Sequence, residues 1–204
     1  MSKNSEPTLS RTPALRALVP EPDRYLIVAG LGTPCFDAAR LTDDGDNLFA
    51  IDGAMGTATA VGTGLALAQP RRRILVITGD GELLMSLGSL PTAATAAPPN
   101  LSILCIDNAA WGLTGFQRTH TSFRTDLAAV AAGSGIPAST TVAVPADLPA
   151  GKSLLEDDTQ VTFVVLRVPP EPPEPYAFER DGPLCRTRFR DHVLGGAPSA
   201  AVTR

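Results

Sequence analysis

The sequence has few of the residues that mark a zinc site or a disulfide framework. It contains three cysteines and two histidines in 204 residues. Cys35, Cys105 and Cys185 are odd in number and far apart, so they show no metal-binding spacing and are typical of a reducing compartment. Neither cysteine chemistry nor a zinc centre is therefore predicted.

The sequence also lacks a long apolar run, an excess of basic charge and the features of a signal peptide. No apolar run is long enough to span a membrane. The N-terminus has no basic region followed by an apolar one. The net charge of −4 argues against nucleic acid or another polyanion as a partner. We therefore expect a cytoplasmic protein that binds neither membranes nor nucleic acids.

What the sequence does contain is enough apolar material for one sizeable core, at 44% hydrophobic content. We expect one α/β domain over residues 24–194, preceded by a flexible segment at 1–23 and followed by a disordered tail at 195–204. Helical patterns alternate with apolar runs at residues 25–29, 74–78, 101–106, 140–144 and 162–168. This alternation predicts a three-layer α/β fold, in which a mostly parallel sheet has helices on both faces.

Polar residues follow two of these apolar runs at the point where each run ends. Asp80 lies in the turn Gly79-Asp80-Gly81 after one run, and Asn108 follows the next. The carboxyl ends of parallel strands meet at one edge of a sheet, where ligands bind. Carboxylate and amide oxygens suit Mg²⁺, and glycines let the backbone approach a phosphate closely. These residues predict a Mg²⁺–diphosphate site; the alternative is a helix cap at Asp80 and an ordinary turn at Asn108.

The pattern Gly79-Asp80-Gly81, 26 further residues and Asn108 resembles the GDG…N signature of thiamine diphosphate (ThDP) enzymes. Gly53-Ala54-Met55-Gly56 resembles the segment that contacts the aminopyrimidine in their decarboxylase branch. The similarity to sulfopyruvate decarboxylase β subunits and to phosphonopyruvate decarboxylase runs over about residues 25–189. The resemblance implies the ThDP-binding fold and the diphosphate-binding β subunit of a ThDP- and Mg²⁺-dependent 2-oxo acid decarboxylase that produces an aldehyde.

By this resemblance, several segments of the chain contact the cofactor. Asp80, Asn108 and the backbone carbonyl of Ala110 match the family's metal ligands. Met55 matches the apolar residue that holds the cofactor bent, although a lone methionine is most commonly a core residue. The cofactor contacts that the resemblance implies are Gly32, Thr33, Gly53, Ala54, Met55, Gly79, Asp80, Gly81, Glu82, Asn108, Gly112, Leu113 and Thr114.

Three charged or titratable side chains near this site have roles that the resemblance leaves open. Glu82 stands where related decarboxylases often have serine, and its carboxylate would repel a diphosphate. We therefore expect Glu82 to contribute only its N–H and either turn its carboxylate away or cap the helix start. Arg118 and His120 are candidate ligands for an anionic substrate group. The alternatives are plain exposure for His120 and a bridge to a partner subunit for Arg118.

No segment of the chain matches the glutamate motif that activates the pyrimidine of ThDP in this family. In the family that glutamate belongs to a pyrimidine-binding domain, so we predict no catalytic residue in this chain. The resemblance implies a hetero-oligomer with a separate pyrimidine-binding α subunit, with active sites at subunit interfaces and a small 2-oxo acid as substrate. Two alternatives stay open, namely a carboligase subunit and a non-catalytic cofactor-binding or assembly subunit.

Overall fold

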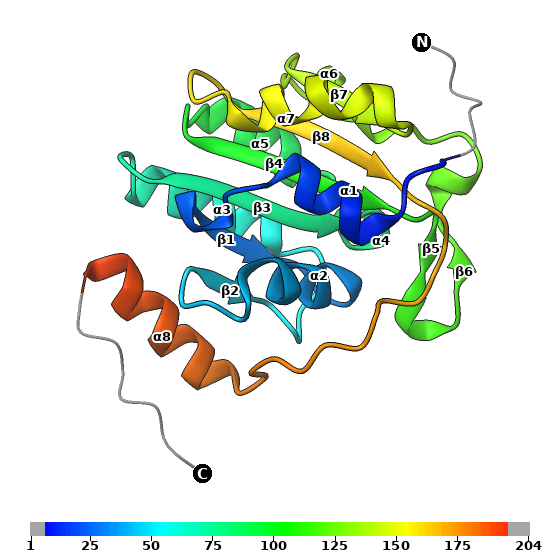
Figure 1. Ribbon diagram of the computed structural model, residues 1–204. Coiled ribbons are helices and arrows are strands. Elements are labelled where there is room, and N and C mark those ends of the chain that lie inside the picture. The colour runs from blue at the N-terminus through cyan, green and yellow to red at the C-terminus, as the bar shows by residue number, and fades with distance from the viewer. Residues whose placement is uncertain (1–6, 196–204) are drawn as a thin grey trace.

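The computed structural model describes residues 7–195 and has a six-stranded parallel sheet at its centre (Figure 1). The strand order is β2-β1-β3-β4-β8-β7, and every neighbouring pair is parallel. The predicted fold class is therefore confirmed. The strands are β1 (Tyr25–Ala29), β2 (Leu48–Ala50), β3 (Arg73–Gly79), β4 (Leu101–Asp107), β7 (Ser139–Val142) and β8 (Thr162–Arg167).

The composition of the central strands explains why they lie between two layers. β4 is buried along its whole length, and β3 is buried except at its two ends. Successive side chains of a strand point to opposite faces of the sheet. Accordingly, Leu75 and Ile77 belong to one buried apolar cluster, while Ile74 and Val76 belong to the other. Near-continuous apolar sequence is what a parallel strand covered on both faces requires.

Helices cover both faces of this sheet, as Figure 1 shows. One face packs against α1 (Arg11–Leu18), α2 (Thr33–Thr42) and α7 (Leu148–Glu156). The other packs against α3 (Ala58–Ala68), α5 (Ser89–Ala96) and α6 (Leu127–Gly133). The last helix, α8 (Gly182–Leu194), lies beside β2. None of the helices within residues 7–195 is both long and apolar enough to cross a membrane.

The structure corrects the expectation of a flexible segment over residues 1–23. Residues 1–6 lie outside the described chain, but α1 and a short 3₁₀ helix, η1 (Pro22–Arg24), follow them. Ala14, Leu15 and Leu18 of α1 are buried against the sheet. These apolar residues repeat at helical spacing, and prolines on either side obscure the pattern in the sequence. Of the predicted tail at 195–204, only Gly195 is among the described residues.

The connection from β3 to β4 also differs from the single helix that the sequence suggested. It consists of two short helices, α4 (Asp80–Leu84) and α5, joined by a turn that contains Gly88. Asp80 is therefore the first residue of a helix that begins directly at the end of β3. This arrangement holds its side chain at the carboxyl edge of the sheet.

Two further segments frame that edge. Beyond β4, a two-stranded hairpin pairs β5 (Ala110–Trp111) with β6 (Gln117–Arg118), with a 3₁₀ turn, η2 (Gly112–Thr114), between them. Two more 3₁₀ turns follow later in the chain, η3 (His120–Ser122) and η4 (Pro145–Asp147). After β8, a proline-rich segment without helix or strand leads across to α8. The side chain of Arg11 donates hydrogen bonds to the carbonyls of Glu171 and Pro172, and so ties this segment to α1.

Candidate functional site

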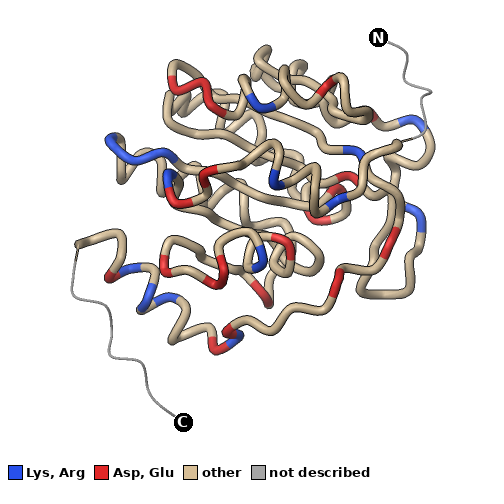
Figure 2. The backbone as a smooth tube through the Cα atoms, viewed as in Figure 1, with Lys and Arg blue, Asp and Glu red and all other residues tan. Residues whose placement is uncertain are grey.

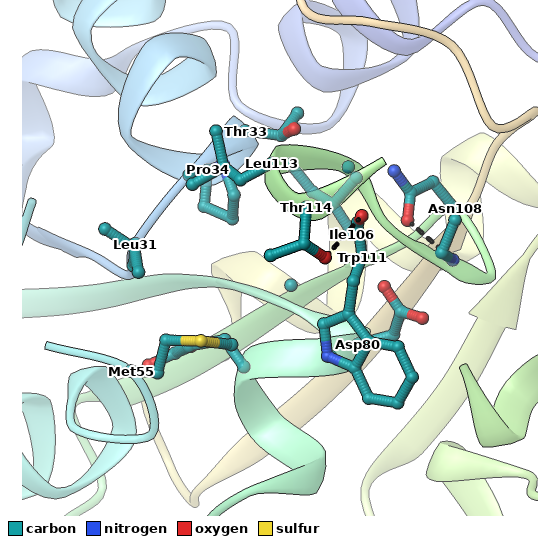
Figure 3. Close-up of a pocket in the computed structure, with 16 residues that line it drawn as sticks. Leu31, Thr33, Pro34, Met55, Asp80, Ile106, Asn108, Trp111, Leu113 and Thr114 are labelled. Carbon is teal, nitrogen blue, oxygen red and sulfur yellow. Dashed lines mark hydrogen bonds between the residues drawn. The ribbon is translucent and has the colours of Figure 1, made fainter. Parts of the chain in front are cut away.

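The two predicted polar residues come together at one edge of the sheet. β3 and β4 are neighbours, with Gly79 opposite Ile106, so Asp80 and Asn108 leave adjacent strand ends. A pocket opens there (Figure 3). Its lining includes all the predicted cofactor and metal contacts except Gly53 and Ala54, which are exposed. The chain thus gathers residues that are up to 83 positions apart in the sequence around one cavity.

Asp80 supplies a buried carboxylate to this pocket. Its side chain is 2% exposed, and Oδ2 accepts hydrogen bonds from the hydroxyls of Thr119 at 2.5 Å and Thr121 at 3.2 Å. Burial, and secondly the nearby carboxylate of Asp107, raise the pKa of Asp80 to about 7. Ionised Asp80 is therefore unfavourable in the chain by itself, and a cation bound beside it would relieve that cost.

Asn108 and Ala110 offer the other two oxygen donors. Asn108 is 5% exposed, and its Oδ1 accepts a hydrogen bond from the backbone N–H of Ala110 at 3.1 Å. Between them Ala109 has a φ of 57°, in the left-handed region that non-glycine residues rarely adopt. Such strain is concentrated at functional sites. The turn it creates keeps Asn108 and Ala110 together in the pocket lining.

The chemistry of this donor set fits Mg²⁺. A carboxylate, an amide oxygen and a main-chain carbonyl are hard ligands, and Mg²⁺ completes its shell with phosphate oxygens and water. Among residues 7–195, no group of three or more His, Cys, Asp or Glu side chains is arranged to hold a metal. A divalent cation at this edge would therefore rely on mixed donors, with Asp80, Asn108 and Ala110 as its predicted ligands.

Close backbone packing explains two of the glycines that line the pocket. A Cβ atom on Gly81 would overlap the indole ring of Trp111. Gly32 has a φ of 82°, and a Cβ there would lie 3.2 Å from the Leu113 side chain. At both positions the hairpin loop packs closely against the strand ends. A side chain at either position would force the neighbouring residues to move.

Glu82 lines the pocket, but its carboxylate is engaged elsewhere. Its Oε1 accepts hydrogen bonds from the backbone N–H groups of Thr57, at 3.1 Å, and Ala58, at 3.2 Å. The hydroxyl of Thr78 donates to Oε2. Of the two expected arrangements, a carboxylate turned away or a cap on the helix start, the geometry has a cap, but on α3 rather than on the helix of Glu82 itself.

Arg118 and His120 are not among the residues that line the pocket. The guanidinium of Arg118 donates to the hydroxyl and carbonyl of Ser122, and it lies 4.2 Å from the centre of the Phe123 ring. The His120 ring meets Trp111 edge to face, with 6.2 Å between ring centres. Both side chains are exposed beside the hairpin, so their roles as substrate ligands stay predictions.

Sequence reasoning missed several residues of the site. Thr119 and Thr121 lie against Asp80, and the Thr121 hydroxyl oxygen is also 2.7 Å from Oδ1 of Asp107, so the two carboxylates share it. Only weak features of the sequence point to these residues: Asp107 directly precedes Asn108, and the two threonines lie two residues apart. The pocket lining also includes residues that the sequence did not single out, namely Leu31, Pro34, Ile106 and Trp111.

Fold and site together define a parallel α/β domain with an oxygen-rich pocket at the carboxyl edge of its sheet. Residues 30–166 match the family model described as thiamine pyrophosphate enzyme, C-terminal TPP binding domain, where thiamine pyrophosphate is another name for ThDP. The match includes most of the described sheet and all of the pocket lining. This chain belongs to that family.

Similar proteins place it within the family. It is 40% identical over 119 residues to the sulfopyruvate decarboxylase β subunit of Methanocaldococcus jannaschii, covering 58% of this chain and 62% of that protein. It is 44% identical over 132 residues to the phosphonopyruvate decarboxylase of Streptomyces hygroscopicus, covering 64% of this chain but only 32% of that one. Among solved structures, benzoylformate decarboxylase from Polynucleobacter necessarius superposes with a TM-score of 0.66 at 17% identity, over 86% of this chain and 36% of that one. The last similarity shows the fold.

Proposed function

We propose that this chain is the diphosphate-binding β subunit of a two-chain, ThDP- and Mg²⁺-dependent decarboxylase that converts a 2-oxo acid to an aldehyde. The observation that carries the proposal is the meeting of Asp80, Asn108 and Ala110 in one pocket of a chain from the TPP-binding family. The names of the relatives, sulfopyruvate and phosphonopyruvate decarboxylase, favour a substrate with a second anionic group.

In this proposal each part of the pocket has a task. Bound ThDP supplies the electron sink that decarboxylation of a 2-oxo acid needs. Asp80, Asn108 and the Ala110 carbonyl would hold Mg²⁺, and the metal would in turn fix the diphosphate. Met55 is half-buried and lines the pocket on the side away from the metal ligands in Figure 3. From there its side chain would support the bent cofactor, and the neighbouring Gly53 carbonyl would accept a hydrogen bond from the aminopyrimidine.

The size of the pocket supports a requirement for a partner. Its volume is about 80 Å³, whereas sites that enclose a drug-sized ligand measure roughly 300–1,000 Å³. This chain by itself would leave much of a ThDP molecule in water. A pyrimidine-binding subunit would cover that part and supply the glutamate for which this chain has no matching motif. Water exclusion by the partner would favour the decarboxylation.

The surface beside the pocket supports the same requirement. Residues 53–70 and 83–100 contain no Lys, Arg, Asp or Glu, and they form the uncharged stretches around α3 and α5 (Figure 2). Exposed apolar side chains lie on or near these stretches, with 38% exposure for Val61, 57% for Leu67 and 64% for Met85. Exposed apolar surface of this kind suits contact with another subunit.

The test compares this chain alone with the same chain co-expressed with a pyrimidine-domain partner. CO₂ release from 2-oxo acids is expected only from the mixture, at a rate that follows complex formation. Asp80→Ala in the mixture should abolish Mg²⁺-dependent ThDP binding, measured by calorimetry, while leaving the circular dichroism spectrum unchanged. Robust decarboxylation by the pure single chain, or unchanged ThDP affinity in Asp80→Ala, would overturn the proposal.

A further inference from the structure

Glu82 is a buried carboxylate for which the proposed reaction has no direct use. Its side chain is 4% exposed, and it reaches from α4 to the N-terminus of α3. Helix α3 begins after Thr57, whose own side chain makes no capping hydrogen bond. The first N–H groups of a helix need acceptors. Glu82 provides this acceptor from 24 and 25 residues away.

Main-chain and hydroxyl donors, instead of a cationic side chain, balance the charge of Glu82. Burial raises its pKa, while hydrogen bonds from the N–H groups of Ala58, Thr57 and Gly56 lower it. The hydroxyl of Thr78, at the end of β3, adds a further donor. A carboxylate is also favourable at a helix N-terminus because of the helix dipole. Glu82 is therefore held in one place by donors from two segments of the chain.

A third segment of the chain packs closely against the Glu82 carboxylate. Gly30 follows β1, and a Cβ atom there would lie 2.5 Å from Oε2 of Glu82 and 2.6 Å from its Cδ. Nearby, a Cβ on Gly56 would lie 3.1 Å from that of Ser86. The segment that contains Met55 is thus held to α4 by the Glu82 carboxylate, and to the turn directly after α4 by close packing of Gly56 against Ser86.

We propose that Glu82 is a positioning residue that fixes the loop of residues 52–57, and Met55 within it, relative to the turn at Asp80. The path is short, because Glu82 lies two residues after Asp80 and its partner Thr57 lies two residues after Met55. The proposal rests on the function proposed above. In this proposal the Glu82 carboxylate positions residues at the pyrimidine end of the cofactor, although the carboxylate itself does not contact the cofactor.

A short polar side chain at position 82 could not perform this role. The carboxylate must span from α4 to α3, and serine lacks the two carbon atoms that extend Glu82 across this gap. Glutamine has the reach and keeps the Oε1 acceptor, although it loses the charge. Glu82→Gln should therefore retain most of the positioning, whereas Glu82→Ala and Glu82→Ser should lose it.

The first measurement is amide hydrogen exchange in the full chain without cofactor. In Glu82→Ala, exchange over residues 57–61 should accelerate at least tenfold, and Glu82→Gln should restore most of the protection. Asp147→Ala is the matched control, since Asp147 also accepts two main-chain N–H groups, from Ala143 and Val144, in a part of the chain outside the pocket lining. It should leave exchange at 57–61 unchanged. Unchanged exchange in Glu82→Ala would overturn the proposal.

The second measurement separates the two ends of the cofactor in the complex with the partner subunit. Calorimetry with Mg²⁺ and inorganic diphosphate probes the metal end alone, and Mg²⁺ with ThDP probes both ends. Glu82→Ala should weaken ThDP binding about tenfold or lower turnover by as much, with diphosphate affinity within twofold of the wild type. An equal loss for both ligands would refute a role specific to the pyrimidine end. Failure of the wild type to bind diphosphate would refute the proposed function, while the exchange result would still decide whether Glu82 holds the loop.

A double substitution provides a third check that does not depend on any ligand. Gly30→Ala places a methyl group against the Glu82 carboxylate and should lower the urea midpoint of the full chain. In Glu82→Ala the carboxylate is absent, so Gly30→Ala should lower the urea midpoint much less in that variant than in the wild type. Additive effects of the two substitutions would contradict the contact on which the proposal depends.

Discussion

Replacing Asp80 by asparagine should stabilise the metal-free chain and abolish its affinity for Mg²⁺. Asp80 is 2% exposed, and its pKa is raised from 3.8 to about 7 by burial and by Asp107. A group whose pKa is raised in the folded state stabilises the fold only while it is protonated. Its contribution is fully present below about pH 4 and is lost as the pH rises through 7. Asparagine never acquires the charge, so it avoids this loss.

The magnitude follows from that change in pKa. A rise from 3.8 to about 7 corresponds to ~4 kcal/mol at pH 8. Against this, asparagine weakens the two hydrogen bonds that Asp80 accepts from Thr119 and Thr121, at a cost of ~1 kcal/mol each. We expect Asp80→Asn to raise the free energy of unfolding by ~2 kcal/mol at pH 8, and to have almost no effect at pH 5.

Urea unfolding in the presence of EDTA, at pH 5 and pH 8, measures both values. Repeating the pH 8 titration with Mg²⁺ and diphosphate should stabilise the wild type but not Asp80→Asn, because only the wild type binds the metal. If Asp80→Asn destabilised the chain by more than ~1 kcal/mol at pH 8 without metal, the reasoning would be refuted. Asp80 would then act as a hydrogen-bond acceptor that stabilises the fold, and its charge would not be unfavourable in the metal-free chain. Equal stabilisation of both proteins by Mg²⁺ and diphosphate would refute its role as a ligand.

Two further predictions concern Met55 and the buried ion pair of Arg11. Met55→Ala, in the complex with the partner subunit, should lower kcat more than it weakens calorimetric ThDP binding, because the lost function is geometric; full turnover would show that Met55 only fills space. Arg11→Met should destabilise the chain by ~3 kcal/mol at pH 8, because it leaves Asp37 buried without its partner at 3.0 Å. The pKa of Asp37 is already raised to about 6, mainly by burial, so this loss should shrink at pH 5, where the carboxyl is protonated. If Arg11→Met shifted the urea midpoint equally at pH 5 and pH 8, this explanation would be contradicted.

The fold could be predicted because its strands carry their signal locally. Apolar, β-branched runs such as Ile74–Thr78 specify strands that are buried on both faces, and the turn at Gly79-Asp80-Gly81 marks where one of them ends. Residues that act at a turn directly after a strand are placed by the strand itself. For this reason the sequence alone predicts that Asp80 and Asn108 lie at the same edge of the sheet.

Contacts across long stretches of sequence could not be predicted in this way. Thr119 meets Asp80 across 39 residues, because a hairpin folds the chain back, and the hairpin depends on the left-handed turn at Ala109. Glu82 reaches the start of α3 because the two segments pack side by side at Gly56. No local sequence pattern predicts either of these contacts. The same holds for α1, whose apolar residues become recognisable once the sheet that they cover is known.

The hydrogen-bond donors of the three buried acidic side chains at this edge favour Asp80 over Glu82 as the proposed position of a cation. Glu82 accepts hydrogen bonds from main-chain N–H groups, which carry their own protons. Asp80 and Asp107 each accept one main-chain N–H group, from Gly81 and Ala109, and otherwise share the hydroxyls of Thr119 and Thr121, which form four oxygen–oxygen contacts with one another and with the carboxylates. Each hydroxyl has a single proton, so two protons serve four contacts. The Glu82 carboxylate has separate donors for both of its oxygens, whereas the two carboxylates of Asp80 and Asp107 share hydroxyl protons, and a divalent cation bound at Asp80 would supply the positive charge that this pair lacks.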